Sequence, residues 1–206
     1  MSSDHSAVSV HEHPPPSFGV PNLKLAFWLF LASDCMLFGS LIATYLSYRG
    51  KDQLFGNGPY PLDLFSVEVT TISTFDLLMS SVTMVLAVAA IQRGNMFQTR
   101  LWLGLTALLG AIFVGFQGYE FTHFYLEGLK LQGNLFGSTF YVLTGFHGTH
   151  VTLGVVWLLL VLATTFTKHK NMVTHLNVEV AGLYWHFVDI VWIVIFTLVY
   201  LMEYTV

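Results

Sequence analysis

Charged side chains are scarce in this chain: Asp, Glu, Lys and Arg make up only 10% of its 206 residues. Soluble domains carry about 25% of such residues. Hydrophobic residues make up 54% of the chain, and the mean hydropathy is +0.65. So few polar side chains cannot cover a water-soluble globule, and most of the surface is therefore expected to face lipid.

Cysteine and basic residues are also few, which excludes several classes of protein. The one cysteine, Cys35, cannot form an intramolecular disulfide framework or a cysteine-rich metal or iron–sulfur site. A formal net charge of −4, with no basic cluster, argues against a nucleic-acid partner. The phosphate-binding loop and the common hydrolase and zinc-protease motifs are absent as well. Any chemistry is therefore expected within the bilayer.

The N-terminal segment differs from the rest of the chain because it is polar. Residues 1–24 include three consecutive prolines and no apolar stretch of the kind found in a secretory signal. The histidines His5, His11 and His13 fit an incidental His-rich tail better than a metal site. We expect residues 1–24 to form a disordered polar tail and residues 25–206 to form one transmembrane domain.

Five hydrophobic runs are long enough to cross the roughly 30 Å of hydrocarbon in a bilayer. They lie at Leu25–Tyr48, Glu68–Gln92, Arg100–Thr122, Phe136–Phe166 and Ala181–Glu203. The sequence therefore predicts an all-α fold, namely a polytopic membrane bundle with five transmembrane helices.

The distribution of lysine and arginine predicts how the bundle is oriented, because cytoplasmic loops carry an excess of these residues. One side collects Lys24, Arg93, Arg100, Lys168 and Lys170, whereas the other collects only Arg49, Lys51 and Lys130. The N-terminus is therefore expected in the cytoplasm and the C-terminus outside.

Several ionisable residues interrupt the spans, where a charge is costly and usually faces protein or water. Some of them are spaced three residues apart, so that they share a helix face. Asp34 lies about 14 Å into its span, near the middle of the membrane. The full set is Asp34, Glu120, His147, His150, Glu179, His186 and Asp189.

A haem or metal site is one interpretation of these residues. It needs histidines on two helices at matched depth, and His150 and His186 fall at comparable depth. The neighbouring Phe146, Trp185 and Phe187 are bulky where a porphyrin would need room.

A proton path and a transport site are further interpretations. A proton path favours acids spaced through the membrane, but Asp34 and Asp189 lie at one level and Glu120 far above them. A transporter favours repeated broken helices, but only one span carries a run of glycines, within residues 145–154. Small residues at such spacing more often allow close helix packing. The residues alone thus favour a polytopic membrane protein with a polar interior that belongs to a larger assembly.

Longer stretches resemble subunit III of haem–copper terminal oxidases. Two of them are GSTFYVLTGFHGTHVTLG at residues 137–154 and YWHFVDIVWIVIFTLVYLM at residues 184–202. FWLFLASDCMLFGSLIATY at residues 27–45 resembles the first helix that the family shares, and FQGYEF at residues 116–121 resembles its glutamine–glutamate segment. The GFHGxHV and WHFVDxVW strings are highly specific together. The resemblance covers about Leu25 to Met202.

The resemblance implies a non-catalytic subunit that holds no haem and no copper. In this family, subunit III lies beside subunit I, which carries the haem and copper, reduces oxygen to water and pumps protons. Subunit III supports sustained turnover of subunit I and binds phospholipid between its helices. The implied partners are subunits I and II, a small subunit IV or a larger respiratory supercomplex, and membrane lipids. The implied location is the bacterial plasma membrane.

The resemblance also implies roles for single residues. Glu120, His147 and His150 match positions that hold neighbouring helices and lipid in register. Glu179 matches a glutamate just before the last span of the family.

Three further residues match family positions on the first and last spans. Asp34 matches the buried carboxylate of the first shared helix, where the family often has the glutamate that reaches about one methylene farther. His186 and Asp189 match the last-helix motif, whose imidazole and carboxylate can pair across helices.

The long form of the family has seven spans, and this chain differs from it. The difference bears on the catalytic subunit and on the electron donor. This chain begins where the third span would start, so we expect the catalytic subunit to carry extra helices that fill the gap. Residues 137–151 resemble the cytochrome c branch more than the quinol branch, which predicts a cytochrome c oxidase, with a quinol oxidase as the alternative. A stand-alone membrane redox protein or transporter is the alternative from another class. Candidate contacts for lipid head groups are Arg49, Lys51, Lys168 and His175.

Overall fold

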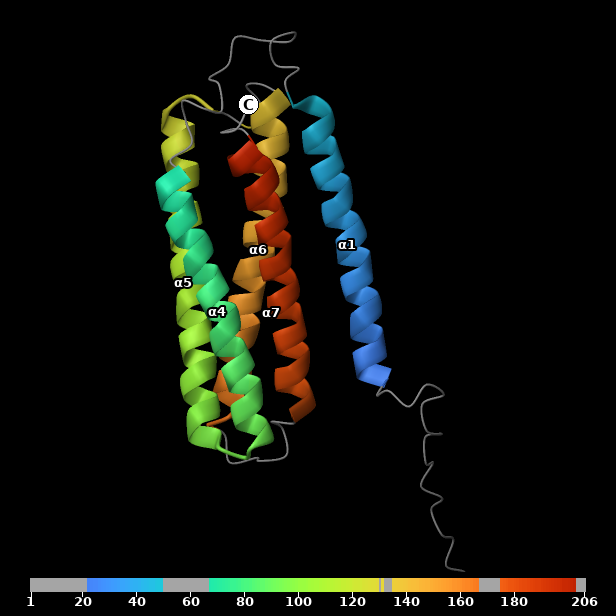
Figure 1. Ribbon diagram of the computed structural model, residues 1–206, viewed down its shortest axis with the longest axis vertical. Coiled ribbons are helices and arrows are strands. Elements are labelled where there is room, and N and C mark those ends of the chain that lie inside the picture. Colours follow the sequence, from blue (N-terminus) through green and yellow to red (C-terminus); the bar gives the residue numbers. More distant parts are fainter. Residues whose placement is uncertain (1–21, 50–66, 130, 132–134, 167–174, 203–206) are drawn as a thin grey trace, which may run out of the picture.

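Long helices account for nearly all of the computed structural model, which describes residues 22–49, 67–129, 131, 135–166 and 175–202. The helices are α1 (Asn22–Tyr48), α4 (Val67–Gln92), α5 (Met96–Leu126), α6 (Leu135–Thr164) and α7 (His175–Ile195), and α7 continues into the π-helix η1 (Phe196–Leu201) (Figure 1). Most of the predicted tail, residues 1–21, lies outside the described residues, as do Lys51 and Lys168.

The predicted fold class is confirmed, because the described residues contain five helices that are long and apolar enough to span a membrane, and no strand. The predicted ends at Tyr48 and Gln92 are confirmed, whereas other helix ends differ from the prediction. Helix α1 begins at Asn22 instead of Leu25, and α7 begins at His175, six residues before Ala181. Hydropathy marks only the part of a helix that crosses hydrocarbon, whereas backbone hydrogen bonds continue into polar residues beyond it.

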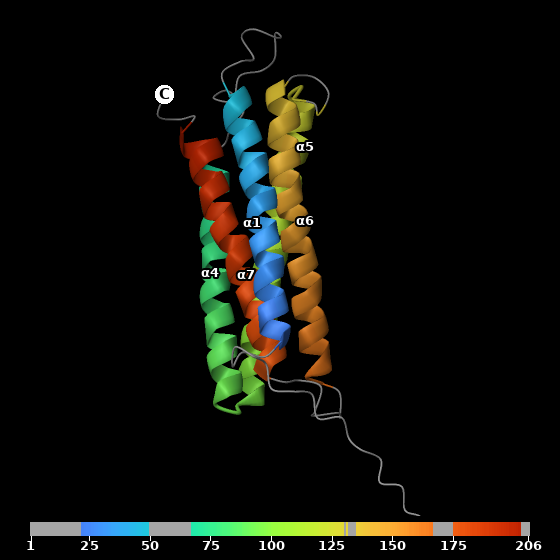
Figure 2. The same ribbon diagram turned by 90° about the vertical axis from the view of Figure 1, so that its right-hand side faces the viewer.

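Four of the helices form a closed ring of antiparallel neighbours. Helix α4 packs against α5 and α7, and α6 packs against the other side of the same two helices (Figures 1 and 2). The chain runs up and down, so that α1, α5 and α7 begin at one end of the bundle, which we call the N-terminal end. Helix η1 finishes at the opposite, C-terminal end.

Helix α1 lies outside this ring, where it packs against α6 and α7 (Figure 2). It buries only Asp34, Phe38 and Tyr45. Most of its apolar side chains, such as Trp28 and Leu29, are exposed, as expected for residues that face lipid. One of the few buried side chains of α1 is therefore a carboxylate.

The connection between α4 and α5 is set by two residues whose chemistry suits a tight turn. Gly94 adopts a left-handed backbone conformation, with φ of 72°, which glycine tolerates without strain. The Gly94 and Asn95 amides donate to the carbonyls of Ile91 and Ala90, which ends α4 in a Schellman motif. The Asn95 side chain then accepts a hydrogen bond from the Gln98 amide and caps the start of α5.

The centre of the ring is organised by Trp185 of α7. Its indole is almost completely buried and donates a hydrogen bond of 2.9 Å to the Ser80 hydroxyl of α4. The ring also lies against the backbones of Gly110 on α5 and Gly154 on α6. Four helices thus meet at one side chain. The interpretation of the glycines within residues 145–154 as packing positions is confirmed at Gly154.

Candidate functional site

The carboxylate of α1 faces a histidine of α6 at the middle of the bundle. Asp34 Oδ2 lies 3.9 Å from His150 Nε2, and the two side chains are largely buried. Phe38 packs edge-on against the same imidazole, with ring centroids 5.0 Å apart. The structure therefore brings together two residues that the sequence singled out separately.

One hydrogen bond of the His150 side chain defines which ring nitrogen carries a proton. Nδ1 lies 2.7 Å from the carbonyl oxygen of Phe146, and because a carbonyl can only accept, Nδ1 must be the donor. Nε2 is left to face Asp34. The separation of 3.9 Å is too long for a hydrogen bond, and Asp34 Oδ2 has no hydrogen-bond partner among the described residues. The two side chains form an ion pair only when the imidazole is protonated.

The second histidine of this helix, His147, is enclosed by aromatic rings. Its imidazole stacks on Trp192, with centroids 4.8 Å apart and planes at 24°. Phe113 meets it edge-on at 5.9 Å. The side chain is fully buried, and neither ring nitrogen has a hydrogen-bond partner among the described residues. This packing makes His147 part of the core between α5, α6 and α7.

Glu120 joins three elements near the C-terminal end of the bundle. Its carboxylate accepts a hydrogen bond of 2.7 Å from Thr70 of α4 and one of 3.2 Å from Tyr200 of η1. All three side chains are buried. Hydrogen bonds to a buried carboxylate are stronger than those between neutral groups, so Glu120 holds α4, α5 and the last turns of the chain together.

His186 and Asp189 of α7 share one hydroxyl of α4. His186 Nδ1 lies 3.3 Å from the Ser81 oxygen, and the same side chain hydrogen-bonds Asp189. The carboxylate oxygen Oδ1 of Asp189 is buried without a partner among the described residues. Both residues of α7 therefore contact α4 through one serine, Ser81, which the sequence did not single out.

Charged side chains clamp the ends of the helices. At the N-terminal end, Lys24 of α1 forms an ion pair of 2.6 Å with Glu179 of α7. At the other end, the Arg49 guanidinium donates to the Met202 carbonyl at 2.9 Å. His175 is exposed at the start of α7. Arg49 and His175 thus lie at opposite ends of the bundle and do not line one common lipid cleft.

The Lys24–Glu179 pair offers a test of how α1 is held. Because both side chains are partly exposed, we expect their coupling in a double-mutant cycle of Lys24→Ala and Glu179→Ala to be only about 0.2–1 kcal/mol. The measurement is the thermal midpoint of the protein in detergent at low salt, and the coupling should shrink at high salt. A coupling of several kcal/mol would contradict the expectation that this partly exposed pair contributes little to holding α1.

Two kinds of polar residue escaped the sequence analysis. Asp76 lies within α4, and its Oδ2 is buried without a partner among the described residues; the signal for it was a lone acid inside an apolar span. Tryptophan donors were also missed. Trp192 donates to Thr74 Oγ1 at 2.9 Å, just as Trp185 donates to Ser80. These hydroxyls appear in the sequence only as ordinary residues of a span.

Comparisons with known proteins identify the family. The family model described as cytochrome c oxidase subunit III matches residues 13–204. The chain belongs to this family. It is 42% identical to cytochrome c oxidase subunit 3 of Bacillus sp. strain PS3 over 181 residues, which cover 88% of this chain and 86% of the relative.

Relatives named as quinol or ubiquinol oxidase subunits match at 42% and 38% identity. The chain is 42% identical to quinol oxidase subunit 3 of Bacillus spizizenii over 178 residues, 86% of each protein. It is 38% identical to cytochrome bo(3) ubiquinol oxidase subunit 3 of Pseudomonas aeruginosa over 202 residues, which cover 98% of this chain and 94% of the relative. The recognition as subunit III of a haem–copper oxidase is therefore confirmed, and the chain is a multi-pass membrane protein and an accessory part of a terminal oxidase.

Proposed function

We propose that this chain supports the structure and sustained turnover of a proton-pumping haem–copper oxidase without holding a cofactor itself. The haem and copper belong to subunit I, with subunit II, and in some assemblies a small subunit IV or a supercomplex, as further partners. The observation that carries the proposal is how the polar residues are used. Glu120, His147 and His186 contact neighbouring helices through hydrogen bonds and aromatic rings, which is how a helix-packing role would use them.

A visible absorption spectrum tests this proposal against a stand-alone redox protein. We expect haem bands in the purified oxidase complex and none in this chain when it is purified alone. The intact complex serves as the positive control for haem loading. A chromophore bound in a one-to-one ratio by the isolated chain would contradict the proposal.

The contact between Asp34 and His150 gives a prediction for turnover. We expect the oxidase that carries Asp34→Asn to start at a normal rate and to lose activity several times faster, because His150 loses its acidic partner at the contact between α1 and α6. The measurement is oxygen consumption over many minutes of continuous turnover. Asp76→Asn, which changes a mid-span acid on α4 that lacks a histidine partner in the described structure, is the matched control. Equal decay in both variants would remove this role from Asp34.

The electron donor of the complex has two candidates. We propose cytochrome c, on the resemblance of residues 137–151 to that branch. A quinol is the second candidate, because relatives named as quinol oxidase subunits match at the same identity. The rates at which the purified complex oxidises reduced cytochrome c and a soluble quinol distinguish the two.

The proposed location is the bacterial plasma membrane, with the N-terminus in the cytoplasm. Lys24, Arg93 and Arg100 gather at the N-terminal end of the bundle, where α1 and α5 begin and α4 ends, and this excess supports the orientation. A reporter enzyme that works only outside the cytoplasm should be active when it is fused to the C-terminus. Phospholipid retained in native mass spectra of the complex would support the proposed lipid binding.

A further inference from the structure

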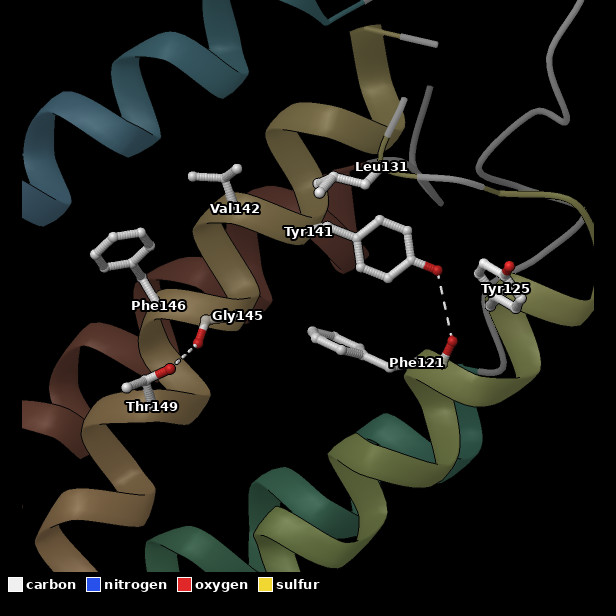
Figure 3. A pocket seen from close by; sticks show the side chains of 8 residues that line it. All are labelled: Phe121, Tyr125, Leu131, Tyr141, Val142, Gly145, Phe146 and Thr149. Carbon is white, nitrogen blue, oxygen red and sulfur yellow. Dashed lines mark hydrogen bonds between the residues drawn. The ribbon is translucent and has the colours of Figure 1, made fainter. Parts of the chain in front are cut away.

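A groove runs along the outer surface of the bundle between α5 and α6. Its upper part is a cavity of about 490 Å³ lined by aromatic and aliphatic side chains, and its lower part is a cavity of about 330 Å³. The two parts share Phe121, Gly145 and Thr149, so they form one continuous depression, which we call the α5–α6 groove. Figure 3 shows the upper part, with Phe121 on one wall and Gly145 and Thr149 on the other.

Small residues keep this groove open. A Cβ atom at Gly118 of α5 would find no neighbouring atom within 4 Å, and one at Gly145 of α6 would meet only Phe121, at 3.8 Å. The chain's own packing therefore does not require either glycine. Small residues on the surface of a membrane helix let the backbone of another helix approach closely.

An unsatisfied acceptor lies at the floor of the groove. Gln117 is nine-tenths buried, and its Nε2 donates to the Thr144 carbonyl at 2.8 Å. This bond fixes the orientation of the amide, because a carbonyl cannot donate. Oε1 then lies against Gly148, 2.5 Å from where a Cβ would be, and has no partner among the described residues.

The other polar groups of the groove do not supply the missing donor. The hydroxyls of Thr149 and Thr152 donate to carbonyls of their own helix, at Gly145 and Gly148. A buried acceptor without a donor is costly, and most costly in a membrane, where water is scarce. The groove is therefore incomplete until something brings an N–H or O–H to Gln117.

The depth of Gln117 decides what can bring that donor. Nine residues separate it from Leu126 at the end of α5, which places it about 14 Å below the helix end. Lipid head groups stay near the membrane surface, and acyl chains carry no donor. A transmembrane helix can place a serine, threonine, asparagine or tryptophan side chain at this depth.

We propose that the α5–α6 groove is the seat of a transmembrane helix from another subunit of the oxidase, which donates a hydrogen bond to Gln117. The inference rests on the proposed function, because it needs a complex. It assigns to this face of the chain an apolar helix whose backbone lies along Gly118 and Gly145. That helix carries one hydrogen-bond donor at the level of Gln117.

Cross-linking in the assembled oxidase tests the proposal with almost no change to the chain. Leu153 lines the lower part of the groove and is exposed, so a diazirine analogue of leucine at this position keeps its size. After illumination of native membranes, we expect an adduct with another oxidase polypeptide. Adducts with lipid only, or with a second copy of this chain, would overturn the inference. Co-purification of haem with the chain reports the proposed function separately, since it can succeed whatever Leu153 labels.

Filling the groove gives an independent test. We expect Gly118→Leu to lower the amount of this subunit per haem in the detergent-purified complex roughly tenfold, because overpacking at a close contact is strongly destabilising. Gly39→Leu on α1 is the matched control, since a Cβ there also meets nothing within 4 Å, and it should be retained. Wild-type retention of Gly118→Leu, or equal loss of both variants, would overturn the inference.

Discussion

Replacing Gly110 by alanine is expected to destabilise the bundle by about 1–3 kcal/mol, the usual cost of inserting a methyl group into a close-packed core. A Cβ at this position would lie 2.7 Å from Trp185 Cζ2 and 2.9 Å from a methyl group of Val155. Neither neighbour can move easily. The Trp185 indole is held by its hydrogen bond to Ser80, and its other side lies against Gly154 of α6.

The matched control for Gly110→Ala is Gly115→Ala on the same helix. A Cβ at Gly115 meets nothing within 4 Å, and both changes raise the intrinsic helix propensity by the same amount, about 1 kcal/mol. The difference between the two variants therefore isolates the clash with Trp185. The measurement is the thermal midpoint at which the subunit loses helical structure in the purified complex. Equal midpoints would contradict the prediction, because they would show that the helices move apart at Trp185 without cost.

Replacing Glu120 by alanine is the second change for which we expect a large effect, a loss of roughly 3 kcal/mol, because two buried hydrogen bonds lose their acceptor. The bonds come from Thr70 and Tyr200, which lie on separate elements. We expect the last turns of the chain to loosen first, since η1 contributes Tyr200 to this contact. Hydrogen exchange of the amides in Phe196–Leu201 should therefore accelerate more than that in α6.

Glu120→Gln separates hydrogen bonding from charge. Glutamine has nearly the same shape, and its carbonyl oxygen can accept from Thr70 while its amide donates to the Tyr200 oxygen. We expect this variant to retain most of the stability that alanine loses. If glutamine were as destabilising as alanine, the negative charge would be the important property, and the hydrogen-bond account of Glu120 would be wrong.

The comparison of sequence with structure shows where prediction from residue patterns works. The five spans followed from hydropathy, because each helix must be apolar along about 20 residues whatever its neighbours are. Some of their ends did not follow, since Asn22–Lys24 and His175–Val180 continue helices beyond the hydrocarbon. The interpretation of Glu120 as a residue that holds helices together fits its two hydrogen bonds, because an acid within a span usually faces protein instead of lipid.

The partners of the buried groups could not be predicted. Nothing in the sequence pairs Asp34 with His150, which are 116 residues apart along the chain, or His186 with Ser81, which are 105 residues apart. Serines and threonines inside spans carry no signal of their own, so the acceptors of the two tryptophans were missed. The same holds for Gln117, whose importance depends on a donor that none of the described residues supplies.

The sequence by itself determined that this protein is a five-span membrane bundle of the subunit III family, because apolar length and two motif strings are local properties of the chain. Only the tertiary structure decided which polar groups satisfy one another, that α1 stands outside a ring of four helices, and that a groove with an open acceptor remains between α5 and α6. The physical reason is that hydrogen bonds and close contacts depend on the rotation and depth of each helix relative to its neighbours. Packing around side chains such as Trp185 sets these quantities, and no single span contains them.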